Sequence, residues 1–546
     1  MNSLEVRKIF LNYFSEKKHK LVPSASVVPN NDPTLLFTNA GMTQFKDVFL
    51  GAETLDFSRA TSAQKCIRAG GKHNDLENVG YTLRHHTFFE MLGNFSFGDY
   101  FKEDAIEYAW DLLINHYKLS KDKLWVTVHI EDQESEKIWL EKIGVDKKRI
   151  SKLNEDNFWS MGDTGPCGPC SEIFYDHGDA LEGSPPEEGK DTGDRFVEIY
   201  NIVFMQFNRD IEGNLKPLPK PSVDTGMGLE RISAVMQGTP DNYQTDLFIP
   251  LIKKISELTG EKDLLNPSLR VIADHLRASC FMISDGIAIG NEGRNYVLRR
   301  IIRRALRHAY KLNSENFYVM SKLATYFSDT YKELYPEIEK NNSFIEKALH
   351  EEEEKFGATL NQGMSLLDEE VKKLKGKVIS GDLAFRLYDT FGFPLDMTLD
   401  FARENNLNVD IEEYEKLMDL QKTRAKESNT FSSLLPSSIE VDGDTNFVGY
   451  DESESKSTIK MIFKDGKRVS KIDGGESAIL FDATPFYAES GGQVGDTGNI
   501  KSKNGSCEVF DTKKVGNQHV HLCKNVSGSL SEGDKVDLTI EADRRL

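Results

Sequence analysis

Four segments of this chain combine residue types that could bind a nucleotide. In the first, Arg68 precedes a Gly-rich polar loop at residues 69–78, and an aromatic run with Phe88 and Phe89 follows. The planar fork of arginine forms paired bonds to phosphate, an aromatic face stacks on a base, and glycines let backbone approach a ligand closely. The pattern predicts a β-hairpin with Arg68 and one of the two phenylalanines on its inner faces. The alternative is a surface hairpin with ordinary ion pairs.

The second segment, residues 223–232, joins a strand-like run to a helix. Gly226 and Gly228 predict a tight turn, and Arg231 lies in the first turn of the helix. A helix N-terminus attracts an anion, and Arg231 would face the same anion. A dinucleotide-binding loop is excluded, because the third glycine is absent and three prolines crowd residues 217–221 before the strand.

The third segment, residues 162–173, contains the spacing Cys167-x-x-Cys170. A zinc site needs a second pair of ligands, and no such pair is visible in the sequence. A thioredoxin-type motif would open a helix, which two prolines and three glycines disfavour. We therefore expect a rigid loop that shapes a pocket, with the cysteines as small apolar fillers. Trp159, just before this loop, is either a pocket wall or a core residue.

The fourth segment is a helical pattern at residues 291–311 with cations on one face. These are Arg300, Arg303, Arg304, Arg307 and Lys311. Cations in such a row can follow a phosphate backbone, which predicts a nucleic-acid contact. The alternative is that they pair with the acidic residues of neighbouring helices.

The pattern of strand-like and helical runs changes twice along the chain, which predicts three domains. A length of 546 residues allows three or four domains. Residues 1–240 alternate short apolar runs with helical patterns, which indicates a domain of strands and helices. Residues 241–437 are dominated by long helical patterns. Residues 438–546 contain short β-like runs between Gly-containing turns, typical of a small sandwich or barrel. The predicted fold class is multi-domain α+β.

Composition limits the functions that remain. Lys and Arg number 68 against 88 Asp and Glu, so the net charge is −20, which excludes a protein that coats nucleic acid by bulk positive charge. No apolar run approaches the roughly 18 residues that span a bilayer, so no membrane partner is expected. Charges throughout residues 1–20 disfavour a signal peptide and predict a cytoplasmic protein. Six cysteines are too few for a disulfide scaffold.

Nine segments, in this order, resemble the class II aminoacyl-tRNA synthetases, and among them those that activate alanine. They are residues 35–46, 66–77, 84–93, 162–173, 201–209, 224–231, 291–307, 388–394 and 486–493. The resemblance implies a catalytic domain at 1–240, built on an antiparallel sheet flanked by helices. It implies a helical domain at 241–437 that recognises the tRNA acceptor stem, and at 438–546 the β-barrel that begins an editing domain.

The same resemblance implies a reaction. Alanine, ATP and Mg²⁺ would give alanyl-adenylate and pyrophosphate, and alanine would then pass to the 3′ end of tRNA(Ala). The carboxylate of alanine is itself the nucleophile, so catalysis rests on positioning and on charge stabilisation at the α-phosphate.

The resemblance also assigns residues to ATP. Arg68 would contact the α-phosphate, Arg231 the adenine face or the γ-phosphate, and His73 the outer phosphates. Phe89 would stack on adenine, with Phe88 as the alternative. The family usually has Arg-x-Glu at the first of these positions, whereas Ala69 and Gly70 follow Arg68 here. The corresponding ATP contact is therefore open, and Glu77 is a candidate for it.

For alanine, Asp224 would bind the ammonium group, and Asn201 would hydrogen-bond nearby. The side-chain pocket would be limited by Gly226, Val203, Met42 and Trp159. For tRNA, Asn291 and Asp389 would read base edges in the acceptor stem, and Arg303 would hold phosphate.

A pocket for alanine separates it from glycine and serine by only about 10–200-fold each, which is why the family edits its products. The zinc-binding His-x-x-x-His motif of that editing domain has no match in these residues, so we expect zinc only in a region beyond residue 546. The chain is then an N-terminal fragment without the catalytic part of the editing domain or the C-terminal domain. We expect it to be monomeric, to hold no metal except magnesium carried with ATP, and not to hydrolyse Ser-tRNA.

Two other functions are compatible with the sequence. One is a class II synthetase or ligase for serine or glycine. The other is a tRNA-binding or stand-alone editing protein without activation chemistry, which Arg68, Asp224 and Arg231 argue against. Exchange of pyrophosphate into ATP with a panel of amino acids separates these three functions.

Overall fold

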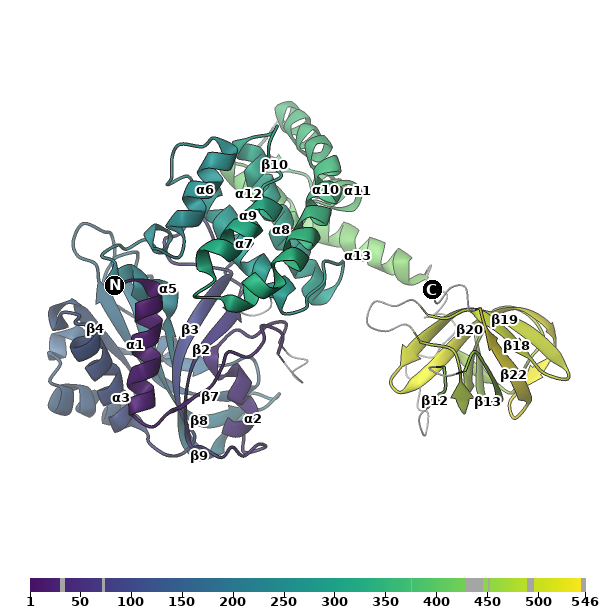
Figure 1. Cartoon of the computed structure of the whole chain (residues 1–546), viewed down its shortest axis with the longest axis horizontal. Helices are drawn as coiled ribbons and strands as arrows, with labels where there is room; N and C mark the ends of the chain where they lie inside the picture. Colours follow the sequence, from purple (N-terminus) through teal and green to yellow (C-terminus); the bar gives the residue numbers. More distant parts are fainter. Residues whose placement is uncertain are drawn as a thin grey trace. The chain divides into compact units, whose positions relative to one another are not determined.

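The structure is a computed structural model that describes residues 1–29, 35–70, 74–374, 376–427, 445–449, 452–488 and 495–541. The chain divides into two compact units, Met1–Val409 and Asp410–Leu546. The predicted sheet-containing region 1–240 and residues 241–409 of the predicted helical region 241–437 lie together in the first unit. Figure 1 shows its helices α6 to α12 gathered at one end of a large twisted sheet.

That sheet has nine strands among the described residues of the first unit. Their order is β1-β2-β3-β9-β8-β7-β4-β5, and β6 pairs with β7 outside this path. The pairs β1–β2 and β4–β5 are parallel, and all other neighbours are antiparallel. The bounds are β1 Lys20–Leu21, β2 Arg59–Ile67, β3 Phe88–Ser96, β4 Leu124–His129, β5 Ile150–Leu153, β6 Phe158–Ser160, β7 Gly165–Asp176, β8 Phe196–Arg209 and β9 Leu215–Gly228.

Helices cover the sheet because each presents an apolar stripe to it. Helix α1 (Ser3–Glu16) begins with a capping box between Asn2 and Glu5 and buries Val6, Phe10 and Phe14. It packs on β2 and β3, α3 (Lys102–Asp111) packs on β8, and α5 (Leu229–Met236) packs on β3, β8 and β9. The shorter helices are α2 (Lys46–Phe49) and α4 (Gln133–Lys137).

The helical part of the first unit is centred on α7 (Pro267–Ser284), whose side chains are buried along nearly its whole length. Helix α7 contacts β3 as well as the helices α6, α8, α9 and α10, so sheet and helices share one hydrophobic core. The other bounds are α6 Ile249–Thr259, α8 Gly293–Leu312, α9 Met320–Tyr331, α10 Pro336–Lys373, α11 Gly381–Phe391 and α12 Leu395–Glu404, with β10 (Val378–Ile379) and β11 (Asn408–Val409) paired beside them.

The second unit begins with α13 (Ile411–Glu427) and continues into a β-barrel. Six described strands close in the order β13-β16-β20-β19-β18-β22, because β22 pairs back onto β13. The bounds are β13 Glu454–Lys464, β16 Ser477–Phe481, β18 Gly498–Lys501, β19 Gly505–Val515, β20 Gln518–Gly528 and β22 Lys535–Ile540, with the short strands β12 Asn446–Phe447, β14 Lys467–Val469, β15 Lys471–Ile472, β17 Ala483–Thr484 and β21 Leu530–Ser531. Of the two expected architectures, sandwich or barrel, this is the barrel.

Two local predictions are wrong. Residues 165–173 are part of strand β7 rather than a loop, because a register shift against β8 between Cys167 and Cys170 accommodates Pro169, which cannot donate a ladder hydrogen bond. At Gly168 in this shift, a Cβ would lie 2.0 Å from the Phe204 carbonyl oxygen, so only glycine fits. Gly226 and Gly228 end strand β9 and do not form a tight turn.

No helix in the described parts of the chain has the length and apolar character needed to cross a membrane.

Candidate active site

A cavity of about 310 Å³ opens in the first unit where β3, β7, β8, β9 and α5 meet. Most of the residues predicted to bind ATP or alanine line this cavity. Its lining includes Ala40, Arg68, Asp75, Arg84, His85, His86, Phe89, Met91, Trp159, Glu172, Glu198, Ile199, Asn201, Val203, Asp224, Gly226, Gly228, Glu230 and Arg231.

Arg68 and Phe89 form one wall of this cavity. Arg68 directly follows β2, and its guanidinium carbon lies 5.0 Å from the centroid of the Phe89 ring. Its Nε donates to the carbonyl oxygen of Asn39, at 3.2 Å, which orients the guanidinium. Phe88 points to the opposite side of β3 and stacks on Phe281, with ring centroids 4.0 Å apart. Alternation along the strand therefore leaves Phe89, and not Phe88, facing the cavity.

Arg231 approaches from the first turn of α5. One guanidinium nitrogen donates to both the carbonyl oxygen and the carboxylate of Glu198, each at 3.0 Å. The side chains of Arg231 and Glu198 are 27% and 33% exposed, so the pair is open to a ligand. Two arginines separated by 163 positions thus face one cavity.

Asp224 supplies a negative charge at the other end. It lies on β9 opposite Val203 of β8, and its residue is 5% exposed. Its Oδ1 has no hydrogen-bond partner within the described residues, and burial raises the pKa of its carboxyl well above the ordinary value. A buried carboxylate without a partner fits a ligand that brings its own cation.

The space beside Asp224 is small. A Cβ on Gly226 would lie 2.9 Å from Met91 Sδ, so a larger residue there would have to displace the Met91 side chain. Asn201, opposite Gly226, donates from Nδ2 to Glu172 Oε1 at 2.8 Å, and its own Oδ1 is buried without a partner in the described structure. The arrangement suits a short ligand that carries both an ammonium group and a donor.

Two carboxylates, those of Glu172 and Glu198, also line the cavity. Burial and then repulsion by Glu198 raise the pKa of the Glu172 carboxyl well above its ordinary value. One or two carboxylates together with phosphate oxygens are the ligand set that magnesium takes at nucleotide sites, so these residues fit that ion. Among the described residues, no group of three or more His, Cys, Asp or Glu side chains is arranged to hold a metal ion by itself.

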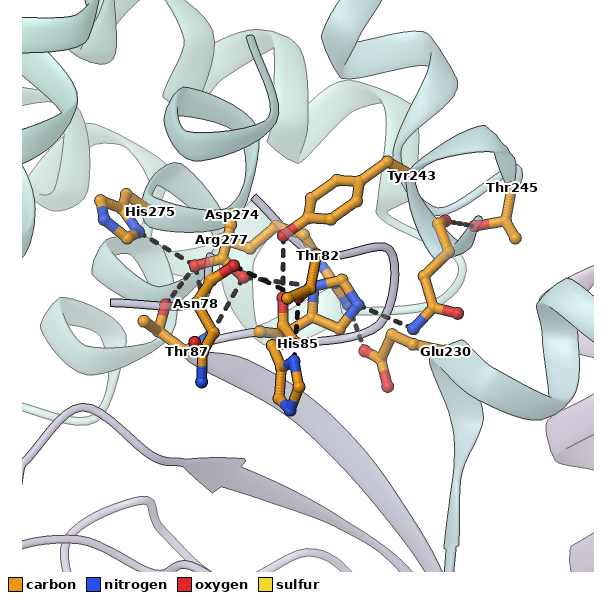
Figure 2. Close-up of polar contacts among 12 residues, drawn as sticks. Asn78, Thr82, His85, Thr87, Glu230, Tyr243, Thr245, Asp274, His275 and Arg277 are labelled. Carbon is orange, nitrogen blue, oxygen red and sulfur yellow. Dashed lines mark hydrogen bonds and ion pairs between the residues drawn. The ribbon is translucent and has the colours of Figure 1, made fainter. Parts of the chain in front are cut away.

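The segment before β3 adds residues to which the sequence analysis gave no role. Arg84 lines the cavity and donates to Asp194 at 2.7 Å and Asp191 at 3.3 Å, and His85 and His86 line it as well. Burial lowers the pKa of His85 to about 4, so its ring is neutral near pH 7. Figure 2 shows the Thr82 hydroxyl beside this ring, with Oγ1 2.9 Å from Nδ1. In the sequence, the aromatic run with Phe88 and Phe89 that follows these three residues could have pointed to them as part of the site.

Comparison with protein families decides what this geometry belongs to. The model of the family described as tRNA synthetases class II (A) matches residues 5–544. The chain belongs to this family of class II tRNA synthetases.

Two curated relatives are similar along the whole chain. The alanine–tRNA ligase of Hydrogenovibrio crunogenus is 54% identical over 547 residues, and that of Idiomarina loihiensis is 52% identical over 547 residues. Each alignment covers 100% of this chain and 63% of the relative, so the chain spans about two thirds of their length. Among solved structures, the pyrrolysyl-tRNA synthetase from Desulfitobacterium hafniense is a weak likeness, with 10% identity, 44% of this chain and 72% of that chain covered, and a TM-score of 0.25.

Two residues predicted for this class II synthetase site do not line the cavity, and a third is not among the described residues. Met42 is fully buried in the cluster behind it, together with Val203. Glu77 is exposed, and its backbone carbonyl oxygen accepts a hydrogen bond from Arg403. Asp75, two residues earlier, lines the cavity instead. His73 lies outside the described residues.

The cations on this face of α8 form ion pairs within the first unit. Arg303 pairs with Glu352 of α10, with Nε to Oε1 at 2.7 Å. The other pairs are Arg300–Asp396, Arg304–Asp400, Arg307–Glu404 and Lys311–Glu404, at 3.5, 2.6, 2.8 and 3.2 Å. The expectation that this face follows a phosphate backbone is therefore not supported, because α10 and α12 present carboxylates to every one of its five cations. Asn291 and Asp389 are both exposed.

Proposed function

We propose that this protein is an alanine–tRNA ligase, which activates alanine with ATP and transfers it to the 3′ end of tRNA(Ala). One observation carries the proposal: Arg68, Arg231 and Asp224, far apart in sequence, face a single cavity of about 310 Å³. The names of the two relatives, each more than 50% identical along the whole chain, support the choice of alanine.

The residues divide between the two substrates. Phe89 stacks on adenine, and Arg231 contacts the adenine face or the γ-phosphate. Arg68, 5.0 Å from the Phe89 ring, stabilises charge at the α-phosphate while the carboxylate of alanine attacks and pyrophosphate leaves. Asp224 pairs with the ammonium group, and Gly226 and Val203 leave room for one methyl group. Glu172 and Glu198 would hold magnesium, which would neutralise charge on the phosphates.

The exposed residues Asn291 and Asp389 are proposed to contact the acceptor stem of tRNA. For Arg303, the bond from its guanidinium to the Gly392 carbonyl oxygen at 2.6 Å and the pair with Glu352 support a role in holding the end of α11. Asp389 lies on that helix, so Arg303 serves tRNA through its position.

The test is exchange of labelled pyrophosphate into ATP with each amino acid in turn. Alanine should give the highest kcat/KM, with glycine and serine lower by about 10–200-fold. Arg68→Gln should lower kcat with alanine by about 100-fold, the usual size of such a loss. A preference for serine or glycine would replace the substrate in the proposal. Binding of tRNA without exchange for any amino acid would overturn the activity.

A further inference from the structure

The segment that carries Arg84, His85 and His86 into the cavity is held by a buried hydrogen-bond network centred on Asp274. Asp274, on the central helix α7, is fully buried and accepts two donors from Thr87. The Thr87 backbone nitrogen lies 3.0 and 3.2 Å from the two carboxylate oxygens, and the Thr87 hydroxyl bonds to Oδ2. Figure 2 shows Asp274 between Thr87 and His275.

Two histidines complete the shell of this carboxylate. Asn242 donates from Nδ2 to His86 Nε2 at 2.9 Å, so the proton of a neutral His86 stands on Nδ1, 3.3 Å from Asp274 Oδ1. Arg304 donates to His275 Nε2 at 2.9 Å, so the proton of His275 stands on Nδ1, 2.9 Å from Asp274 Oδ2. The His275 imidazole therefore donates an N–H to Asp274, whereas His86 Nδ1 lies beside the carboxylate without a hydrogen bond to it.

These bonds decide the charge of the carboxyl. Burial alone would raise the pKa of Asp274, but the hydrogen bond from His275 and the proximity of His86 outweigh it and hold this pKa below the ordinary value. Asp274 is thus an anion in the protein interior, and its negative charge fixes the tautomers and orientations of both rings.

The network also holds the backbone of this segment of the cavity wall. The Tyr243 hydroxyl donates to the His85 carbonyl oxygen at 2.9 Å, so the short stretch from His85 to Thr87 is held at both ends (Figure 2). His86 itself lines the cavity, and Phe89 follows two residues after Thr87. In contrast, Asp224 and Asn201, at the other end of the cavity, lie on β9 and β8, and Asp274 contacts neither.

We propose that Asp274 is a positioning residue for the nucleotide: through Thr87 and His86 it sets the place of the cavity wall formed by Arg84, His85 and Phe89. This rests on the proposed function only in naming ATP as the ligand of that wall. Displacement of such groups by a fraction of an ångström is enough to weaken a bound transition state strongly.

The test is Asp274→Asn in the whole protein. The amide keeps the size of the carboxyl, but its NH₂ group must face the N–H of a histidine or the Thr87 donors, so donor meets donor. In pyrophosphate exchange the KM for ATP should rise by about ten-fold, the factor for one lost charge-assisted hydrogen bond, while the KM for alanine changes less than about two-fold. A role in folding alone would lower the active fraction without this split.

The chain offers a matched control. Glu353 on α10 is also fully buried and accepts two backbone N–H groups and one hydroxyl, from Met320 and Ser321, at 2.6, 3.3 and 2.6 Å. It does not line the cavity. Glu353→Gln should lower thermal stability and leave the KM for ATP unchanged. If both variants raise this KM alike, or Asp274→Asn does not raise it, the proposal is wrong.

Two further measurements cover the remaining outcomes. If Asp274→Asn does not fold, Thr87→Val, which removes the hydroxyl donor, should raise the KM for ATP a few-fold, and Thr87→Ser should not. Calorimetric binding of a non-hydrolysable ATP analogue with Mg²⁺ needs no amino acid. Weaker binding in Asp274→Asn would support the positioning role even if alanine were not the substrate, and equal binding would overturn it.

Discussion

Asp224 is a side chain whose charge costs the folded protein free energy until a ligand arrives. Burial raises the pKa of its carboxyl, so the folded state binds its proton more tightly than the unfolded state. Its contribution to stability is therefore most favourable at low pH and falls as pH rises toward the folded-state pKa. Asp224→Asn removes the buried charge, and we expect the free energy of unfolding at pH 7 to rise by about 1 kcal/mol or more.

The same variant should lose its substrate. Exchange with alanine should become undetectable, because no anion remains to pair with the ammonium group. In the unchanged protein the KM for alanine should rise as pH falls through the raised pKa, since protonated Asp224 cannot form the pair. Thermal unfolding and exchange kinetics, measured over a series of pH values above the ordinary carboxyl pKa of 3.8, test both effects. An Asp224→Asn protein that is less stable and still active would contradict this account.

Phe88 and Phe89 allow a test with neighbouring residues of the same type. Phe89 faces the cavity beside Arg68, whereas Phe88 stacks on Phe281 in the core. Phe89→Leu should raise the KM for ATP by about ten-fold, because stacking of a base on an aromatic ring contributes about 1–3 kcal/mol. Phe88→Leu should lower the melting temperature and leave that KM unchanged. The reverse pattern would show that the two roles are exchanged.

At the scale of elements, α8 and α12 are joined by a buried ion pair. Arg304 Nε and Asp400 Oδ2 are 2.6 Å apart, and both side chains are less than 5% exposed. Asp400→Asn leaves the guanidinium without its counter-charge, which costs about 3–5 kcal/mol of stability at pH 7. Burial alone would raise the pKa of Asp400, but the nearby His308 and the hydrogen-bonded charge of Arg304 outweigh it and lower this pKa, so the contribution of this pair is lost only in strong acid.

Urea unfolding of the Asp400→Asn variant measures this cost. Lys311→Ala is the control on the same helix, because Lys311 is 47% exposed in its pair with Glu404. It should change stability by less than about 1 kcal/mol. Equal effects of the two variants would mean that burial does not decide the strength of these pairs.

Helix α11 is expected to act on tRNA and not on ATP. Asp389 is exposed on this helix and lies outside the lining of the cavity. Asp389→Ala should lower the rate of tRNA(Ala) charging by at least about ten-fold, the size of a lost base-edge contact, and leave pyrophosphate exchange unchanged. Asp382→Ala, another exposed acidic residue of α11, should leave both rates unchanged. A loss of exchange in Asp389→Ala would indicate a folding defect instead.

At the scale of the whole molecule, activation and the barrel are separable. Every described residue lining the cavity lies between Ala40 and Arg231, within the unit Met1–Val409, and as far as the structure describes them the hydrophobic clusters of the barrel contain no residue of that unit. A protein ending at Val409 should fold and retain alanine-dependent exchange within about two-fold, as expected for units with separate cores. Circular dichroism and exchange rates check this. An unfolded product would show that the first unit needs the second.

Local pattern was enough for much of the molecule. Helical periodicity predicted α8 and the helical character of residues 241–437, the motif around Arg68 predicted the β2–β3 hairpin, and short β-runs predicted the barrel strands, since each depends on spacing along a few turns or residues. Residue chemistry alone also singled out Arg68 and Arg231, and the resemblance to class II synthetases added Asp224. Strand β7 was missed because its prolines are tolerated only through a register shift against β8.

Tertiary contacts decided the remainder, because they join residues that no local window contains. Which phenylalanine faces the cavity depends on the neighbour Phe281, and the cations of α8 are neutralised by helices α10 and α12. Glu77 and Asp75 differ by two positions, and the loop geometry alone places Asp75 at the cavity. Asp274 is 187 residues from Thr87, so the hydrogen bonds by which it holds this segment can be seen only in the folded chain.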